Sequence, residues 1–243
     1  MPAAATKTSS SPAASGASHP GAGPDTSRSS VPAAKPAART RPEAGGQTLA
    51  GNAVHVADNP DKAGDFEANA NDIASLLEAR QTSRIFLTQL GAQTRSTVLS
   101  AFDAGASLVS YVGHGSQALW ASESILRSID VALLQPQPRQ PLMLTMTCSN
   151  GYFVSPFLNG IAERFVLEPD KGAIAAFSPS GLSLDSAAHL FHRALVQELE
   201  AGRHERLGDL ILAAQGHYAD TGAFPELLSI YHLFADPALR IRH

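Results

Sequence analysis

The sequence predicts an α/β protein with a mainly parallel, six-stranded sheet that is covered by helices on both faces. From about residue 52 onward, short β-rich apolar runs alternate with stretches that carry apolar residues at helical spacing. This alternation implies repeated strand–helix–strand units, which build parallel sheets. About 190 residues are available for a single buried core. With one cysteine, the chain forms no internal disulfide, so packing must supply the stability.

Residues 1–50 differ in composition from the rest of the chain. They are almost entirely Ala, Ser, Pro, Gly and Thr, and their only large apolar residues are Met1, Val31 and Leu49. Ordering a backbone costs roughly 1–2 kcal/mol per residue, which so little apolar surface cannot offset. We therefore predict a disordered tail over residues 1–50 and one folded core over residues 51–243.

The first half of the core is expected to hold three strands and two helices. In chain order, we expect a strand at 53–57, a helix at 66–77, a strand at 84–87, a helix at 94–104 and a strand at 107–112. Thr94 is a plausible N-cap of the second helix, and Gly105 stands where a C-terminal cap would.

The second half is expected to complete the sheet. In chain order, we expect a weak helix at 124–134, a strand at 142–146 after the breaker Pro141, a helix at 158–167, a strand at 173–177, helices at 185–200 and 207–218, and a sixth strand at 228–234.

Charge and hydropathy exclude several classes of partner. The net charge of −4, with 16% charged residues, argues against nucleic acid as the main partner. No apolar run of about 18 residues is present, so we expect no membrane-spanning helix. The N-terminus lacks the apolar core of a secretion signal, which predicts that the protein stays inside the cell or that its export signal lies outside this reading frame. The oligomeric state is not indicated.

Two strand ends carry residues suited to chemistry. Gly113-His114-Gly115-Ser116 follows the third strand, and Thr147-Cys148-Ser149-Asn150-Gly151 follows the fourth. In parallel sheets, ligands bind beyond the carboxyl ends of the strands. If the two strands are neighbours, His114 and Cys148 emerge at the same edge.

A thiol and an imidazole at one edge can cleave a peptide bond. A thiol is intrinsically nucleophilic and needs only modest activation, and an imidazole titrates near neutrality and can protonate a departing amine. Gly115 lets the chain pass close to a substrate carbonyl, and the N–H of Cys148 is the expected second donor to the oxyanion. The alternative is that Cys148 is a small buried core residue and His114 an ordinary surface residue, and the residues alone leave both open.

The chain resembles a known family at these motifs. Tyr111 to Ser116, then Trp120, then Thr147 to Phe153 are similar to the paired active-site motifs of the gingipain-type cysteine peptidases, which share a clan with caspases and legumains. The order, His-Gly first and Cys second, also matches. Further similar blocks are Val56 to Asp61, Ala162-Glu163, Lys171 to Ala175 and Asp236 to Leu239.

The resemblance covers about residues 53–242 and implies a fold and an activity. The fold would be a caspase-like three-layer sandwich. The activity would be that of a cysteine endopeptidase, with Cys148 as nucleophile, His114 as acid/base and a polypeptide as substrate. We expect no cofactor, and no residue of the chain is assigned as a metal ligand. Relatives carry an acidic residue that orients the histidine, and Asp58 falls at that position. Asp58 is also a good turn residue in Asp-Asn-Pro-Asp.

The resemblance assigns substrate contacts to four further residues. Trp120 belongs to the first motif, and Ser178 and Ser180 lie on the segment expected to line the primary specificity pocket. Asp65 lies near a carboxylate that receives an Arg side chain in trypsin-like members, but we favour Asp65 as the N-cap of the following helix. Family members are often secreted by bacteria and carry an upstream subdomain, whose place a low-complexity tail takes here.

Two other functions remain open. The chain could be a catalytically inactive relic or protein-binding module, since the upstream subdomain is missing, or a cysteine acyl hydrolase of small esters. Other histidines do not suggest a metal site. His189 and His192 lack a Glu between them and are expected on a solvated helix face, and His204, His217 and His232 have no partners at metal-ligand spacing.

Overall fold

The computed structural model describes residues 46–77 and 80–243, which belong to one compact unit. The predicted tail lies outside the described residues, except for its last five positions. There, strand β1 (Gln47–Thr48) pairs in parallel with β10 (Ile241–Arg242), and Leu49 is buried in the core. The folded unit therefore begins before residue 51.

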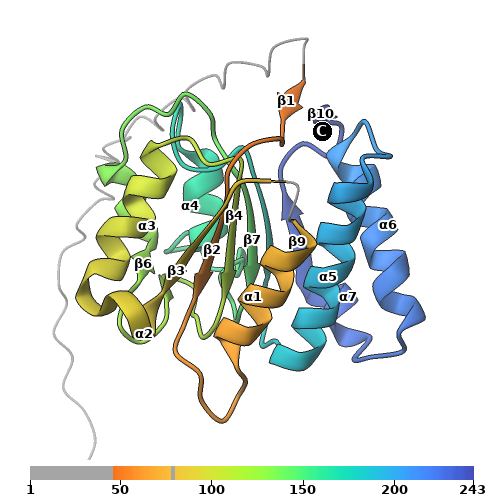
Figure 1. Cartoon of the computed structure of the whole chain (residues 1–243), viewed down its shortest axis with the longest axis horizontal. Helices are drawn as coiled ribbons and strands as arrows, with labels where there is room; N and C mark the ends of the chain where they lie inside the picture. The colour runs from red at the N-terminus through yellow and green to blue at the C-terminus, as the bar shows by residue number, and fades with distance from the viewer. Residues whose placement is uncertain (1–45, 78–79) are drawn as a thin grey trace, which may run out of the picture. The chain divides into compact units, whose positions relative to one another are not determined.

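A six-stranded sheet forms the centre of this unit (Figure 1). Its strands, in spatial order, are β3 (Thr82–Phe86), β2 (Ala53–Ala57), β4 (Leu108–Val112), β7 (Leu142–Met146), β8 (Ala175–Pro179) and β9 (Tyr231–Phe234). The first five strands run parallel, and β9 pairs antiparallel with β8. The predicted α/β class with a mainly parallel six-stranded sheet is confirmed.

Helices cover both faces of the sheet. One face is covered by α1 (Phe66–Leu76), α5 (Asp185–Ala201) and α6 (Leu207–Asp220), and the other by α3 (Thr94–Asp103) and α4 (Ile161–Leu167), as Figure 1 shows. The core is accordingly double: Phe66, Phe177 and Phe191 pack on the first face, and Phe102 and Phe165 on the second. No helix of the described part is long and apolar enough to cross a membrane.

Short elements join the layers. They are α2 (Leu87–Leu90), the 3-10 helices η1 (Gly91–Gln93) and η2 (Ser128–Leu133), α7 (Glu226–Ile230) and the hairpin of β5 (Leu119–Trp120) and β6 (Leu126–Arg127). Two sequence expectations are corrected here. The weak helix at 124–134 is β6 followed by a 3-10 helix, and the run at 228–234 is split between α7 and β9, because an apolar run alone does not distinguish strand from helix.

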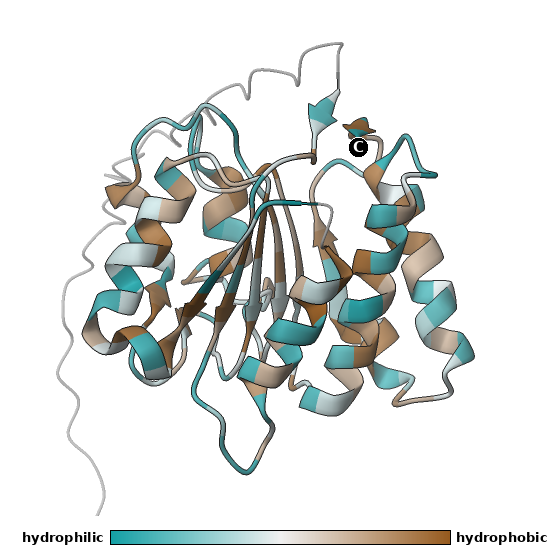
Figure 2. Cartoon of the chain, viewed as in Figure 1, coloured by the Kyte–Doolittle hydropathy of each residue, from teal (hydrophilic) through white to brown (hydrophobic). Residues whose placement is uncertain are grey.

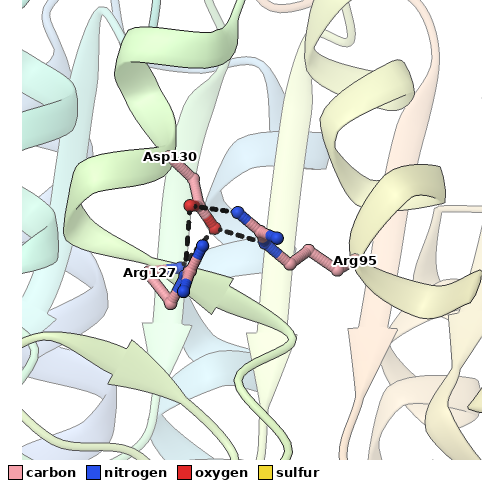
Figure 3. Close-up of polar contacts among 3 residues, drawn as sticks. All are labelled: Arg95, Arg127 and Asp130. Carbon is pink, nitrogen blue, oxygen red and sulfur yellow. Dashed lines mark hydrogen bonds and ion pairs between the residues drawn. The ribbon is translucent and has the colours of Figure 1, made fainter. Parts of the chain in front are cut away.

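A buried carboxylate explains why residues 126–133 fold this way (Figure 3). Asp130 has no exposed surface and accepts hydrogen bonds from Arg95 Nε and Nη2 at 2.8 and 2.6 Å. It also accepts the backbone N–H of Arg127 at 3.0 Å. Asp130 thus caps η2 and ties it to α3, which fixes the hairpin that follows the His114 motif. Thr94 is the first residue of α3 rather than its N-cap, and its hydroxyl donates to Gly91 O instead.

Candidate active site

His114 and Cys148 follow adjacent strands. Val112, the last residue of β4, stands opposite Met146, the last of β7. Two residues beyond each, the side chains of His114 and Cys148 line one cavity of about 240 Å³. The hydrophilic loop that follows β2, teal in Figure 2, reaches the same end of the sheet. The structure therefore brings the two predicted side chains together at the carboxyl edge.

The thiol of Cys148 is half-buried and is held by one backbone segment. Its Sγ accepts the N–H of Ser183 at 3.4 Å and donates to the carbonyl of Ser183 at 3.6 Å. The next residue, Ser149, has a left-handed backbone (φ 55°), so the chain turns sharply away from the thiol. The Ser149 N–H donates to Gly181 O at 2.9 Å, which fixes that turn against the segment after β8.

The ring of His114 is half-exposed and is positioned by two contacts. Its Nε2 lies 2.9 Å from Asp61 Oδ2, and its edge meets the Phe66 ring with the centroids 5.2 Å apart. The hydrogen bond to His114 lowers the pKa of Asp61. Asp61 therefore remains a carboxylate, able to stabilise an imidazolium.

Asp58 does not contact this ring. It is buried, and its Oδ2 accepts the backbone N–H of His114 at 3.2 Å, whereas its Oδ1 accepts the N–H of Asn59 at 2.8 Å. Burial raises its pKa. Asp58 fixes the backbone that carries the imidazole, and the ring itself is paired with Asp61. The structure therefore gives Asp58 no direct contact with the ring, so an effect of Asp58 on the orientation of the ring passes through the backbone of His114.

Two glycines are required beside His114. Gly113 has φ 151°, and a Cβ there would lie 2.3 Å from Asp58 Cβ. A Cβ on Gly115 would lie 2.4 Å from Thr147 Oγ1. A side chain at Gly113 would therefore push the end of β4 away from the residue that follows β2, and a side chain at Gly115 would push it away from the residue that follows β7.

The amide of Gly115 is available to a ligand. Gly115 faces Trp120 as a non-hydrogen-bonded pair, because the flanking bonds run from Ala121 N–H to His114 O and from Ser116 N–H to Leu119 O. Within residues 46–77 and 80–243, neither this N–H nor that of Cys148 donates a hydrogen bond. Two such amides can receive an oxyanion.

The remaining predicted contacts lie away from the cavity. Trp120 has no exposed surface and stacks on Tyr111, with ring centroids 4.4 Å apart. Tyr111 in turn donates to His114 O at 2.5 Å, so Trp120 stabilises the backbone of His114 through Tyr111. Ser178 is buried and accepts from Thr145 Oγ1 at 2.6 Å. These positions correct the expectation that Trp120 and Ser178 meet the substrate.

Ser180 and Asp65 have structural partners instead. The Ser180 hydroxyl donates to Ile230 O at 3.1 Å and pairs with His232 Nε2 at 2.9 Å. Asp65 caps α1 by accepting the Ala68 N–H at 3.0 Å, as the favoured interpretation predicted. Neither residue lines the cavity that holds the thiol.

The sequence analysis missed the wall formed by the start of α5. Leu184, Asp185 and Ala188 line the cavity together with the thiol, next to Ser183, the last residue of the segment that was expected to line the specificity pocket. Asp185 accepts a hydrogen bond from Asn69 Nδ2 at 2.9 Å, and burial raises its pKa. These residues follow β8, so the strand-end rule applied to a third strand would have found them.

A second imidazole lies inside the molecule, not on a solvated face as expected. His192 has no exposed surface, and its Nε2 is 2.9 Å from Ser110 Oγ. His55, opposite Ser110 in the sheet, is equally buried, and neither ring nitrogen has a partner among the described residues. Burial lowers the pKa of His55 to about 4 and that of His192 well below its usual value. His189, in contrast, is half-buried and pairs with Asp72.

Comparison with solved structures shows the same fold in cysteine peptidases. The crystal structure of the Arg-specific cysteine proteinase gingipain R matches with a TM-score of 0.69 and 20% identity over 80% of this chain. The complex of Porphyromonas gingivalis RgpB pro- and mature domains matches with a TM-score of 0.67 and 19% identity over 79% of it. This chain spans 48% of the length of each of those chains.

A further match, with a lower TM-score, comes from a protein complex. The Saccharomyces cerevisiae separase–securin complex matches with a TM-score of 0.55 and 13% identity, over 81% of this chain and 12% of that one. A search of curated protein sequences finds no match.

The fold is the caspase-like α/β architecture that the matching cysteine peptidase structures share. The model of Peptidase family C25 matches residues 37–242. The chain belongs to this family, the gingipain family of cysteine peptidases.

Proposed function

We propose that this protein is a cysteine endopeptidase in which Cys148 attacks the scissile carbonyl and His114 is the acid/base. One observation carries the proposal: the two side chains follow adjacent parallel strands and line a single cavity. A nucleophile and a base that share one cavity are the minimum for covalent acyl transfer.

The geometry supports a division of roles. The Cys148 thiolate adds to the carbonyl carbon of the peptide, and the oxyanion is received by the amides of Gly115 and Cys148. When the C–N bond breaks, the His114 imidazolium gives its proton to the departing amine and leaves a thioester on Cys148. Water, deprotonated by His114, then hydrolyses the thioester and releases the acid. Asp61 holds the imidazole and stabilises its charged form, and Asp58 fixes the backbone of the same loop.

The test is alkylation of the intact protein together with cleavage of an unfolded polypeptide. We expect iodoacetamide to add one group at Cys148 faster than to free cysteine, and peptide cleavage to be lost in Cys148→Ala. Ser110→Ala is the matched control, because it removes a nucleophilic side chain that lies in the core.

Two results would contradict the proposal. A thiol that reacts no faster than free cysteine, with no cleavage of any polypeptide, would favour the binding module instead. Turnover of small esters without peptide cleavage would favour an acyl hydrolase.

A further inference from the structure

Large apolar side chains are exposed on both chain segments that flank the thiol. On the segment after Cys148, Phe153 is 48% and Phe157 is 95% exposed. On the segment after β8, Leu182 is 83% and Leu184 is 45% exposed. We refer to these four side chains as the apolar rim.

Hydrogen bonds place the two segments side by side. Ser149 N–H donates to Gly181 O at 2.9 Å, and Gly151 N–H donates to Pro179 O at 2.8 Å. Phe153 packs edge-on against His232, with centroids 5.3 Å apart, and His232 pairs with Ser180. The two halves of the rim therefore leave from backbone segments that lie side by side.

The rim is also joined to the cavity. Leu184 lines it, and its neighbour Ser183 makes both hydrogen bonds to Cys148 Sγ. On the other side, Gln117 Nε2 donates to Tyr152 O at 3.0 Å and to Leu158 O at 2.6 Å. Gln117 follows His114 by three positions. The segment of the His114 motif therefore holds the half of the rim that carries Phe153 and Phe157, and the Cys148 thiol holds the half that carries Leu184.

The composition of the two segments fits an uncharged ligand. No Lys, Arg, Asp or Glu occurs between Arg139 and Glu163, or between Lys171 and Asp185. Contiguous exposed apolar surface marks interaction sites, and burial of a side chain such as Leu contributes roughly 1.5–3 kcal/mol.

We propose that the apolar rim binds bulky apolar side chains of the polypeptide substrate next to the scissile bond. This inference rests on the proposed function and adds the substrate class to it. Leu184 lines the cavity that holds the thiol, so a substrate side chain beside the scissile bond can reach it, and Leu182 lies two residues earlier on the same segment. The protein then prefers polypeptides in which Leu, Phe, Ile or Met stands close to the cleaved bond.

The experiment compares two rim variants with a matched control. Phe157→Ser and Leu182→Ser change the most exposed rim residues, and Leu212→Ser changes a leucine that is 69% exposed on α6. Each variant digests a mixture of peptides whose residues around one position are systematically varied, and mass spectrometry identifies the cleaved bonds. Thermal unfolding checks that all three variants fold.

We expect the wild type and Leu212→Ser to cleave mainly beside bulky apolar residues. In the rim variants, we expect KM for such peptides to rise about tenfold with kcat nearly kept, and peptides with Ala or Gly there to be unaffected.

Three results would contradict substrate binding by the apolar rim without contradicting the proposed peptidase activity. The first is cleavage by the wild type without regard to apolar neighbours, and the second is rim variants that behave like Leu212→Ser. The third is a wild-type dimer in sedimentation that the rim variants break, which assigns the rim to self-association. If the wild type cleaves no polypeptide and its thiol is not activated, the proposed function fails as well.

Discussion

Two pairings of a nucleophilic side chain with an imidazole differ in their access to solvent: one lies in the core, and the other lines a cavity. Ser110 and His192 are bonded at 2.9 Å and sealed between the sheet and α5. Cys148 and His114 come from strand ends and share a cavity with exposed loops.

The two pairs differ in access because their residues stand at different positions along the strands. Ser110 stands in the middle of β4, opposite His55 and Leu144. His114 stands four positions later, where the backbone has left the sheet. A buried strand places every side chain against another layer, whereas a strand end places it beside solvent. Access to a cavity therefore distinguishes the pair that we propose to react from the pair in the core, even though their chemical groups are similar.

Replacing the two imidazoles should give the largest contrast between these regions. We expect His114→Ala to lower kcat/KM for peptide cleavage by about 10²–10⁴, the usual value of general acid–base catalysis. We expect the double variant Ser110→Ala/His192→Leu, which removes both polar partners together, to keep kcat/KM within about threefold. Steady-state kinetics of both proteins measures the contrast, and equal losses would contradict it.

A side chain at Gly115 should act next most strongly. In Gly115→Ala, the new Cβ meets Thr147 Oγ1, which has no hydrogen-bond partner among the described residues. The loop must then shift and misplace the oxyanion amide, and we expect kcat to fall about 10²-fold.

The double variant Gly115→Ala/Thr147→Ala removes the clashing oxygen and sharpens this prediction. We expect it to recover at least about tenfold of the loss in kcat. No recovery in the double variant would show that the close approach of these residues is not the cause.

The two buried histidines, His55 and His192, should instead influence how the free energy of unfolding depends on pH. Because burial lowers the folded-state pKa of His55 to about 4, protons bind the unfolded chain first as the pH falls below about 6.5. Stability is thus full above pH 6.5 and is lost toward pH 4, by about 2 kcal/mol at pH 5 for this residue. His192 acts in the same direction.

Urea unfolding at pH 7 and pH 5 measures the free energy of unfolding. We expect His55→Leu to reduce the difference between the two pH values. Glu198, whose pKa is lowered by His204 and Arg203 against the effect of burial, loses its contribution only below about pH 4.5 and does not obscure this window. An unchanged difference in His55→Leu would contradict the assignment.

The smallest expected effect distinguishes the two aspartates. Asp61→Asn should lower kcat/KM about tenfold without changing stability, because Asp61 is exposed and contacts only the imidazole ring and its own turn. Asp58→Asn should instead lower the free energy of unfolding by about 1–2 kcal/mol, because Asp58 accepts two backbone amides in a buried place. Kinetics and urea unfolding of both variants check the division, and reversed effects would contradict it.

The sequence was sufficient to predict which strands carry His114 and Cys148 at their ends. It was not sufficient to predict the first and last residue of every strand, on which the position of Ser178 depends. The strands at 53–57, 107–112 and 142–146 follow from apolar runs with clear breakers, and they bring His114 and Cys148 to one edge. The strand expected at 173–177 lies at 175–179. This shift of two residues moves Ser178 from a loop into the buried sheet.

The helical spacing of apolar residues in α5 already indicates that His192 is buried. His192 lies on the same face of α5 as Ala188, Leu195 and Leu199, all of which are buried. Its burial was therefore legible from spacing. The choice between Asp58 and Asp61 was not, because both lie in one turn and only the tertiary structure decides which carboxylate faces the ring.

The short parallel ladder between β1 and β10 joins the beginning and end of the folded unit beside the amino ends of the strands. A central strand such as β2 has five residues and is about 17 Å long. The β1–β10 ladder therefore lies about one strand length from the loops that hold the thiol. An affinity tag, fluorophore or surface anchor attached after His243 would consequently leave the mouth of the cavity open to long polypeptides.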